Sequence, residues 1–249
     1  LQVFINSLRT DADVKTRPFG LPDTWTVQNW PETWRIGDYG SAFLSTIFIS
    51  AVVVLLTLTV VGLGAYALAK MEFRGREIII AYFFVVMSLP GFLYIVPDFF
   101  IFNWLGVLNN RIALAVLYTA MAIPFQMLLL RTFLVGIPRE VEEAAKIDGC
   151  NEFEVFVKVT LPLAKTIFMT VALLVFVDVW NEFLWANTFL MDDSIKTVAT
   201  RVVRFIGVHS SDMAKIYTSC AITILPIVVL FLMFNRKFIE GMTSGSLKG

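Results

Sequence analysis

Histidine and cysteine are almost missing from this chain of 249 residues. His209 is the only histidine, and the two cysteines, Cys150 and Cys220, lie far apart. A single histidine leaves almost no room for a histidine-based zinc site or for a mechanism that needs two histidines. Two isolated cysteines give neither a metal-binding spacing nor a disulfide framework. We expect no metal site, and we expect His209 to lie in a surface loop and Cys220 to be a small apolar helix residue.

Motifs that bind nucleotides or carry out hydrolysis are also missing. The sequence has no Gly-x-x-x-x-Gly-Lys-Ser/Thr phosphate loop, and its closest glycine cluster, Gly241 to Gly249, lacks that spacing. It has no His-Glu-x-x-His and no Gly-x-Ser-x-Gly motif, which argues against an intramembrane enzyme. We therefore expect a chain that does not bind ATP by itself, has no cofactor of its own and is not an enzyme.

Charged residues make up only 16% of the chain, against about 25% in an average soluble domain. The 20 basic and 20 acidic residues cancel, so nothing in the net charge indicates a nucleic-acid partner. Hydrophobic residues reach 57%, and the mean hydropathy is +0.75. This excess is typical of a membrane protein, because it is gathered in long uncharged runs rather than spread evenly.

Four runs contain no charged residue and are about as long as a membrane span: 39–69, 78–97, 112–130 and 216–235. A fifth run, 166–191, is mostly apolar but carries carboxylates. About 20 apolar residues in helical form cross the ~30 Å hydrocarbon layer. The runs are continuously apolar rather than alternating, which favours helices over the strands of a barrel. The predicted fold class is therefore all-α, a polytopic transmembrane helix bundle.

We expect a single transmembrane domain over residues 1–249. The expected segments are the end of a first span (1–8), an external loop (9–40), span 2 (41–69), span 3 (78–102), span 4 (111–134), a cytoplasmic loop (136–162), span 5 (163–190), a second external loop (191–214), span 6 (215–236) and a cytoplasmic tail (237–249). In this orientation 11 Lys and Arg residues face the cytoplasm and 9 face the other side, the sign that the positive-inside rule requires. Because the chain opens at Leu1 rather than at Met, we expect most of the first span to be absent.

Several residues inside and between the spans predict local features. Gly62 and Gly64 stand among alanines in span 2 and indicate close helix packing, with lipid-facing surface as the alternative. Trp25, Trp30 and Trp34 of the first external loop are expected at the membrane interface, and 195–206 of the second is expected to be amphipathic. The span prolines are expected to bend their helices: Pro90, Pro97, Pro124 and Pro226.

The cytoplasmic loop predicts two short helices joined by a turn. Pro138 suits a first helical position, and acidic residues crowd the first turns, where the helix dipole favours them. Gly149 is placed as a C-terminal cap, which gives a helix over about 138–148. Asn151 and Glu154 then predict a capping box for a second helix, which Leu161-Pro162 ends or bends. Such an ordered loop favours docking onto a protein partner, with an amphipathic connector on lipid headgroups as the alternative.

This loop resembles the EAA loop of binding-protein-dependent ABC importer permeases. The resemblance is carried by Glu143-Ala144-Ala145 and Asp148-Gly149, followed by Phe156, Val159, Leu161 and Pro162, with types and spacing kept over about 25 positions. It implies a type I ABC importer permease with six spans, in which a coupling helix inserts into a cleft on a separate ATPase. By this resemblance the ATPase-docking residues are Glu143, Ala144, Ala145, Asp148 and Gly149.

Other stretches are similar to the carbohydrate-uptake branch of that family, the maltose-transporter type. They are Asn6-Ser7-Leu8-Arg9, Ala65 to Lys70 with Phe73-Arg74-Gly75-Arg76, Trp180-Asn181-Glu182-Phe183 and Gly241 to Gly249. The resemblance implies import of a sugar or oligosaccharide delivered by an extracytoplasmic binding protein. The implied partners are an ABC ATPase dimer that holds ATP and Mg, a second and non-identical permease subunit, and membrane lipid. The implied location is the bacterial or archaeal cytoplasmic (inner) membrane, in multi-pass form.

A sugar path through the membrane needs polar groups and aromatic faces. The candidates are Asp178, Asn181, Glu182 and Trp185, and in one continuous helix positions 178, 182 and 185 share a face. Because an ionisable residue at membrane depth is costly, Asp178 is expected to face the bundle interior. The alternative is structural pairing with another polar side chain, with the partner permease supplying most sugar contacts.

Two other functions stay open from the residues alone. Asp178 and Glu182 could serve as a proton relay in an ion-coupled secondary transporter, although such a transporter has no ATPase to dock. An ABC permease for a non-sugar solute, such as an amino acid or a metal, would share the EAA loop.

Overall fold

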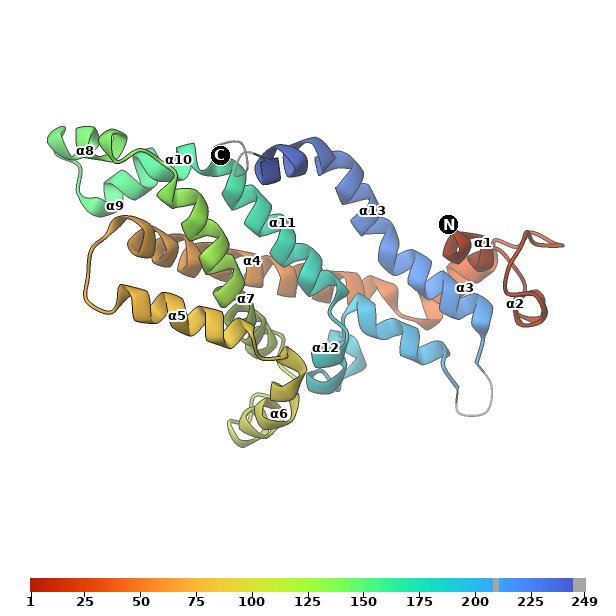
Figure 1. Ribbon diagram of the computed structural model, residues 1–249. Helices are drawn as coiled ribbons and strands as arrows, with labels where there is room; N and C mark the ends of the chain where they lie inside the picture. The colour runs from red at the N-terminus through yellow and green to blue at the C-terminus, as the bar shows by residue number, and fades with distance from the viewer. Residues whose placement is uncertain (208–210, 244–249) are drawn as a thin grey trace. The chain divides into compact units, whose positions relative to one another are not determined.

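The computed structural model describes residues 1–207 and 211–243, and these form helices with no strand among them (Figure 1). In this described part, three helices are long and apolar enough to cross a membrane: α4 (Tyr39–Lys70), α7 (Arg111–Val135) and the first two thirds of α13 (Met213–Thr243). Two bent helix pairs raise the number to five if each pair makes one span. The predicted all-α membrane class is therefore confirmed.

The first bent pair lies in the predicted span 3, 78–102, and its bend is the one that Pro90 was expected to cause. Here α5 (Arg76–Met87) is followed by the 3-10 turn η1 (Gly91–Tyr94) and by α6 (Ile95–Trp104), with a bend of 89°. Pro90 adopts an extended conformation at the break. Proline has no N–H for the helix ladder and disfavours a helical conformation at the residue before it. In contrast, Pro124 and Pro226 lie inside α7 and α13 without ending them.

The second bent pair joins the cytoplasmic loop to the fifth apolar run. A short helical segment, α9 (Glu152–Val155), η2 (Phe156–Thr160) and α10 (Leu161–Leu163), meets α11 (Lys165–Asn181) at 81°. The segment η2 is a π-type turn, which takes up an extra residue in the helix. Within the predicted span 5, 163–190, the helix is not continuous, because α11 ends at Asn181 and α12 (Leu184–Phe189) follows a break.

The two segments that were predicted to be external loops contain helices. The first holds α2 (Asp11–Thr16) and α3 (Asn29–Ile36) after the short α1 (Gln2–Ser7). The second holds η3 (Asp193–Ile195) and η4 (Val198–Phe205), and η4 buries some of its side chains while others stay exposed. At the other end, α13 runs beyond the predicted end of the last span at 236, to Thr243. His209 and positions 244–249 of the predicted tail lie outside the described residues.

The chain forms two compact units. The first contains Leu1–Ile49, Val107–Arg111 and Trp180–Phe234, and the second contains Ser50–Gly106 and Ile112–Val179. In the first unit a small core forms around Tyr39, which stacks on Trp34 and is hydrogen-bonded to Ser219. The side chain of Trp25 is exposed to 62% and that of Trp34 to 47%, whereas Trp30 packs against this core.

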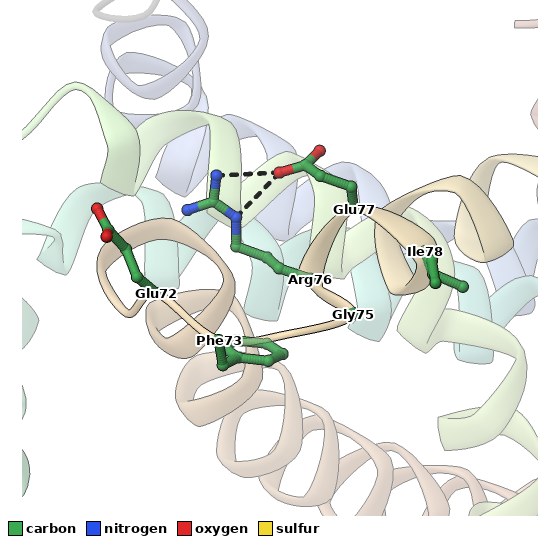
Figure 2. Close-up of a pocket in the computed structure, with 6 residues that line it drawn as sticks. All are labelled: Glu72, Phe73, Gly75, Arg76, Glu77 and Ile78. Carbon is green, nitrogen blue, oxygen red and sulfur yellow. Dashed lines mark hydrogen bonds and ion pairs between the residues drawn. The ribbon is translucent and has the colours of Figure 1, made fainter.

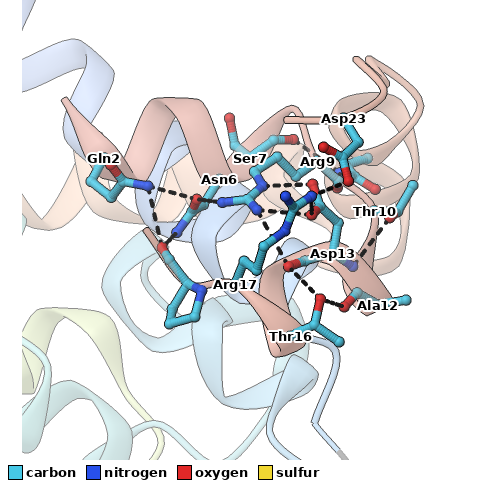
Figure 3. Close-up of polar contacts among 12 residues, drawn as sticks. Gln2, Asn6, Ser7, Arg9, Thr10, Ala12, Asp13, Thr16, Arg17 and Asp23 are labelled. Atoms are coloured by element: carbon cyan, nitrogen blue, oxygen red, sulfur yellow. Dashed lines mark hydrogen bonds and ion pairs between the residues drawn. The ribbon is translucent and has the colours of Figure 1, made fainter. Parts of the chain in front are cut away.

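A polar network orders the first residues of the chain (Figure 3). The fully buried Arg9 guanidinium donates to both carboxylate oxygens of Asp13, at 2.8 and 2.9 Å, and to Asn6 at 3.1 Å. Arg17 forms ion pairs with Asp13 and Asp23. These bonds hold the segment after α1 by charge-assisted contacts rather than by an apolar core.

The core of the second unit is built where α4 packs closely against its neighbours. A Cβ atom added at Gly62 would lie 2.9 Å from the Phe168 ring, and one added at Gly64 would lie 2.6 Å from the Met127 side chain. The glycines therefore let α4 approach α11 and α7 closely, as predicted. Around them lie the fully buried Val61, Ala65, Leu130, Leu134 and Ala164.

Candidate functional site

The predicted docking helix is α8 (Arg139–Ile147) in the second unit. Pro138 is its N-cap in an extended conformation, one position before the first helical position that the sequence predicted. Glu140 and Glu142 lie in the first turn and Lys146 in the last, an arrangement that suits the helix dipole at both ends. The helix is thus stabilised by its own sequence at the place that the sequence indicated.

The turn after α8 has the two hydrogen bonds of a Schellman motif. The N–H of Gly149 donates to the carbonyl of Lys146, and the N–H of Cys150 donates to the carbonyl of Ala145, both at 3.0 Å. Gly149 has φ +92°, in the left-handed region that glycine adopts without cost. The predicted glycine cap is confirmed, and the geometry fixes the direction in which the chain leaves α8.

The second short helix begins with the predicted capping box. Asn151 accepts the N–H of Glu154, and the Glu154 carboxylate accepts the N–H of Asn151. The capped C-terminus of α8 and the capped N-terminus of α9 are therefore separated by only a few residues. We call α8, this turn and α9 the cytoplasmic hairpin, residues 139–155, after the side of the membrane on which the sequence predicts them.

The exposed surface of the cytoplasmic hairpin carries the predicted docking residues. Glu143, Ala144, Asp148 and Gly149 are exposed, and Ala145 is half-buried. Two large apolar side chains that the sequence analysis did not single out are exposed as well, Ile147 to 86% and Phe153 to 63%. An apolar surface on a charged hairpin is the composition expected for a protein-binding surface.

The opposite side of the hairpin is anchored to the end of α4 by a buried ion pair and by further polar contacts that sequence reasoning missed. Lys70 Nζ lies 3.2 Å from Glu142 Oε1 and donates to the carbonyl oxygen of Ile137 at 2.7 Å. The hydroxyl of Thr160 donates to the same Glu142 oxygen at 3.1 Å. One turn earlier in α4, the Tyr66 hydroxyl donates to Glu152 at 3.1 Å. A lysine at the C-terminal end of an apolar helix ordinarily indicates only a favourable interaction with the helix dipole. Nothing in the sequence therefore identified the partners of Lys70 and Tyr66.

An open hollow of about 360 Å³ lies over the turn between α4 and α5 (Figure 2). It is lined by Glu72, Phe73, Gly75, Arg76, Glu77 and Ile78. Arg76 is paired with Glu77 at 2.9 Å, so its charge is already neutralised there. None of the predicted site residues lines this hollow. Among the described residues no group of three or more His, Cys, Asp or Glu is arranged to hold a metal ion.

The four predicted path residues lie on α11, on α12 and at the break between these helices. Asp178 is exposed on the surface of α11 in this single chain, so its expected place in the interior of the bundle stays a prediction. Asn181, the last residue of α11, is exposed too. Because the helix breaks after Asn181, positions 178, 182 and 185 do not share one helical face.

Glu182 and Trp185 have structural contacts at this break. The Glu182 carboxylate accepts the N–H groups of Trp185 and Ala186, each at 2.9 Å, and so caps the start of α12. Trp185 is buried, and its ring lies 5.5 Å from that of Phe189. A carboxylate at a helix N-terminus satisfies free N–H groups, which explains why it is tolerated in an apolar run.

Residues 59–243 match the family described as binding-protein-dependent transport system inner membrane component. The chain is 31% identical to the diacetylchitobiose uptake system permease protein NgcG of Streptomyces coelicolor, covering 100% of this chain and 83% of NgcG. It is 31% identical to the arabinooligosaccharides transport system permease protein AraQ of Halalkalibacterium halodurans, covering 100% of this chain and 90% of AraQ.

A solved structure shares the fold. A chain of a bacterial ABC transporter involved in the import of the acidic polysaccharide alginate superimposes with a TM-score of 0.82 at 23% identity. The match covers 95% of this chain and 89% of that one.

Proposed function

Because this chain belongs to the family of binding-protein-dependent transport system inner membrane components, we propose that it forms half of the pore of an ATP-driven importer for a sugar or oligosaccharide. It is a multi-pass membrane transport subunit rather than an enzyme. Membership of this family implies an ATPase partner and a substrate-binding protein. The proposed location is the bacterial or archaeal cytoplasmic membrane.

The substrate class is supported by the relatives. The two permeases compared above serve uptake of diacetylchitobiose and arabinooligosaccharides, and both align with the whole of this chain. The short stretches similar to the carbohydrate-uptake branch point the same way. A non-sugar solute is the alternative within the family, and an ion-coupled secondary transporter is not favoured.

The proposed ATPase-docking surface is the exposed side of the cytoplasmic hairpin, with Glu143, Ala144, Ala145, Asp148 and Gly149 as its contact residues. The observation that carries this proposal is the exposure of Ile147 and Phe153 on a hairpin whose ends are fixed by backbone caps. A rigid helix can transmit force, and a small exposed alanine surface lets a partner approach closely. ATP and Mg²⁺ are proposed to bind on the partner ATPase, and no cofactor is assigned to this chain.

The proposed translocation path is lined by Asp178 and Asn181, whereas Glu182 and Trp185 hold α12 in place. A carboxylate that faces acyl chains at membrane depth is costly, so the exposed Asp178 calls for a polar or protein neighbour. A second, non-identical permease subunit that covers this surface supplies such a neighbour and would close the pore.

Gly149 provides the sharpest test of the docking surface. The chain is co-expressed with its ATPase, second permease and binding protein, and recovery of the ATPase in the purified complex is measured for Gly149→Pro and Gly149→Ala. Proline can adopt neither the positive φ nor the hydrogen bond to Lys146, so ATPase recovery should fall by at least about tenfold. Alanine should cause a smaller loss, because the strain is about 1 kcal/mol and no atom lies within 4 Å of the added Cβ.

Gly106→Ala is the matched control. Gly106 also has a positive φ, +68°, with nothing within 4 Å of an added Cβ, but it lies between α6 and α7. The control should keep its ATPase. If Gly149→Pro inserts normally and also keeps the ATPase and wild-type transport, the hairpin is only a linker and the docking proposal fails.

A further inference from the structure

Two side chains at the end of α4 contact the two short helices of the cytoplasmic hairpin separately. Tyr66 and Lys70 are four residues apart and therefore lie on one face of α4. Lys70 pairs with Glu142 of α8, and Tyr66 donates to Glu152 of α9. Glu152 also accepts from Lys146 at 2.6 Å, which ties α9 back to α8. We call these contacts the α4 clamp.

The centre of the α4 clamp is a buried ion pair. The side chain of Lys70 is 5% exposed and that of Glu142 is 6% exposed, and Thr160 beside them is fully buried. Besides each other, Lys70 has the carbonyl oxygen of Ile137 and Glu142 has the hydroxyl of Thr160. Separating the pair would leave a buried charge without its counter-charge, which is energetically costly. We therefore expect α4 and α8 to move together.

A second ion pair between nearby segments shows the contrast. Glu72, just after α4, lies 3.6 Å from Arg139, the first residue of α8. Their side chains are 80% and 56% exposed, so water can replace the partner of either one. Exposed pairs of this kind contribute little to stability. Only the buried pair is built to hold α8 against α4.

The α4 clamp connects α8 directly to α4, although the two helices are not adjacent along the chain. Along the sequence, α8 is joined to α7 before it and to α9 and α11 after it, whereas α4 is separated from it by α5, α6 and α7. We propose that Lys70 and Glu142 are positioning residues that transmit displacement of the docking helix to α4, the longest apolar helix described. The inference rests on the proposed function, because it takes an ATPase at α8 as the source of the movement.

The experiment measures two properties separately in the complete importer reconstituted in vesicles: binding of the ATPase, and coupling of ATP hydrolysis to solute import. The variants are Lys70→Met, Lys70→Arg and Glu142→Gln, with Arg139→Gln as the matched control from the exposed pair. Three quantities are measured: ATPase recovered in the complex, solute imported per ATP hydrolysed, and stimulation of hydrolysis by the loaded binding protein.

We expect Lys70→Met and Glu142→Gln to retain the ATPase but to import about fivefold less solute per ATP or worse, with hydrolysis less dependent on the binding protein. Lys70→Arg keeps the charge and should recover most of the coupling. Arg139→Gln should stay within about twofold of the unmodified chain. A merely structural role would lower the amount of complex without changing the import-to-hydrolysis ratio.

Glu142→Gln guards against a variant that fails to fold, since the amide oxygen can still accept from Thr160. Wild-type import per ATP in both Lys70→Met and Glu142→Gln would overturn the clamp and leave the docking surface intact. An unmodified chain that recovers no ATPase would instead refute the proposed function, and the clamp with it.

Discussion

Asn151 and Glu154 cap each other's backbone: the Asn151 side chain accepts the Glu154 N–H, and the Glu154 carboxylate accepts the Asn151 N–H, each at 3.0 Å. The pair fixes the start of α9 two residues after Gly149 ends the turn of α8. The direction of α9 therefore depends on a few local hydrogen bonds at the exposed end of the hairpin.

Replacing Asn151 by alanine should remove this cap. We expect a loss of about 1 kcal/mol in the local stability of α9, because a backbone N–H at the helix start loses its acceptor. Hydrogen–deuterium exchange of the α9 amides in the purified protein measures the effect. Glu154→Gln is the control, since glutamine preserves the capping box and loses only the exposed ion pair with Lys158. Equal exchange in the two variants would contradict the capping role.

Gly62 and Gly64 should differ in their tolerance to alanine. At Gly62 the added Cβ meets the ring of the buried Phe168, which cannot move easily. At Gly64 it meets the terminal methyl group of Met127, a flexible side chain that can turn away. Gly62→Ala should therefore be destabilised by about 1–3 kcal/mol and Gly64→Ala by less, as measured by thermal unfolding in detergent. Similar melting temperatures for the two variants would show that α4 and α11 are not in fixed contact.

Glu182 should prove to be a helix cap. Glu182→Ala leaves the N–H groups of Trp185 and Ala186 without their acceptor, so α12 should lose about 1–2 kcal/mol of local stability. Exchange at these two amides should rise, while the preference among sugars stays unchanged. An altered preference among sugars, with unchanged amide exchange, would instead support the prediction that Glu182 lines the translocation path.

Acid should destabilise the segment after α1 that contains Asp13. The Arg9 guanidinium holds the pKa of Asp13 well below its ordinary value of about 3.9. Because the pKa is lower in the folded protein, the stabilisation is fully present above about pH 5 and is lost as the pH falls through and below that ordinary value. Unfolding temperatures between pH 3 and 7 should show this loss.

Asp13→Asn should be less stable at neutral pH and should lack that acid-dependent part. Asp23→Asn, which changes an exposed carboxylate that also faces Arg17, should keep most of the acid dependence. An unchanged pH profile in Asp13→Asn would contradict the role of the Arg9–Asp13 pair.

Local signals account for the predictions that the structure confirmed. The long uncharged runs required helices, because lipid offers no partner for free backbone groups. The positive φ of Gly149 and the Asn151–Glu154 box follow from residue types within a few positions of one another. Such features need no information from the rest of the chain.

The features that the sequence did not predict depended on distant neighbours or on several overlapping local preferences. The bend at Pro90 follows from the proline itself, whereas the break of the fifth run after Asn181, where Glu182 turns to the start of α12, was not predicted. The place of Asp178 inside the bundle stays a prediction, because which face of α11 is covered depends on the packing of other helices.

The sequence by itself determined an all-α membrane subunit with a capped cytoplasmic hairpin, because hydropathy and capping act over one span or one turn. Only the tertiary structure decided what that hairpin is fastened to. Lys70 and Glu142 are separated by three helices along the chain, and their contact arises because close packing of α4 brings the ends of both helices together in the folded unit. A buried charge finds its partner in space, and its position in the sequence alone does not name that partner.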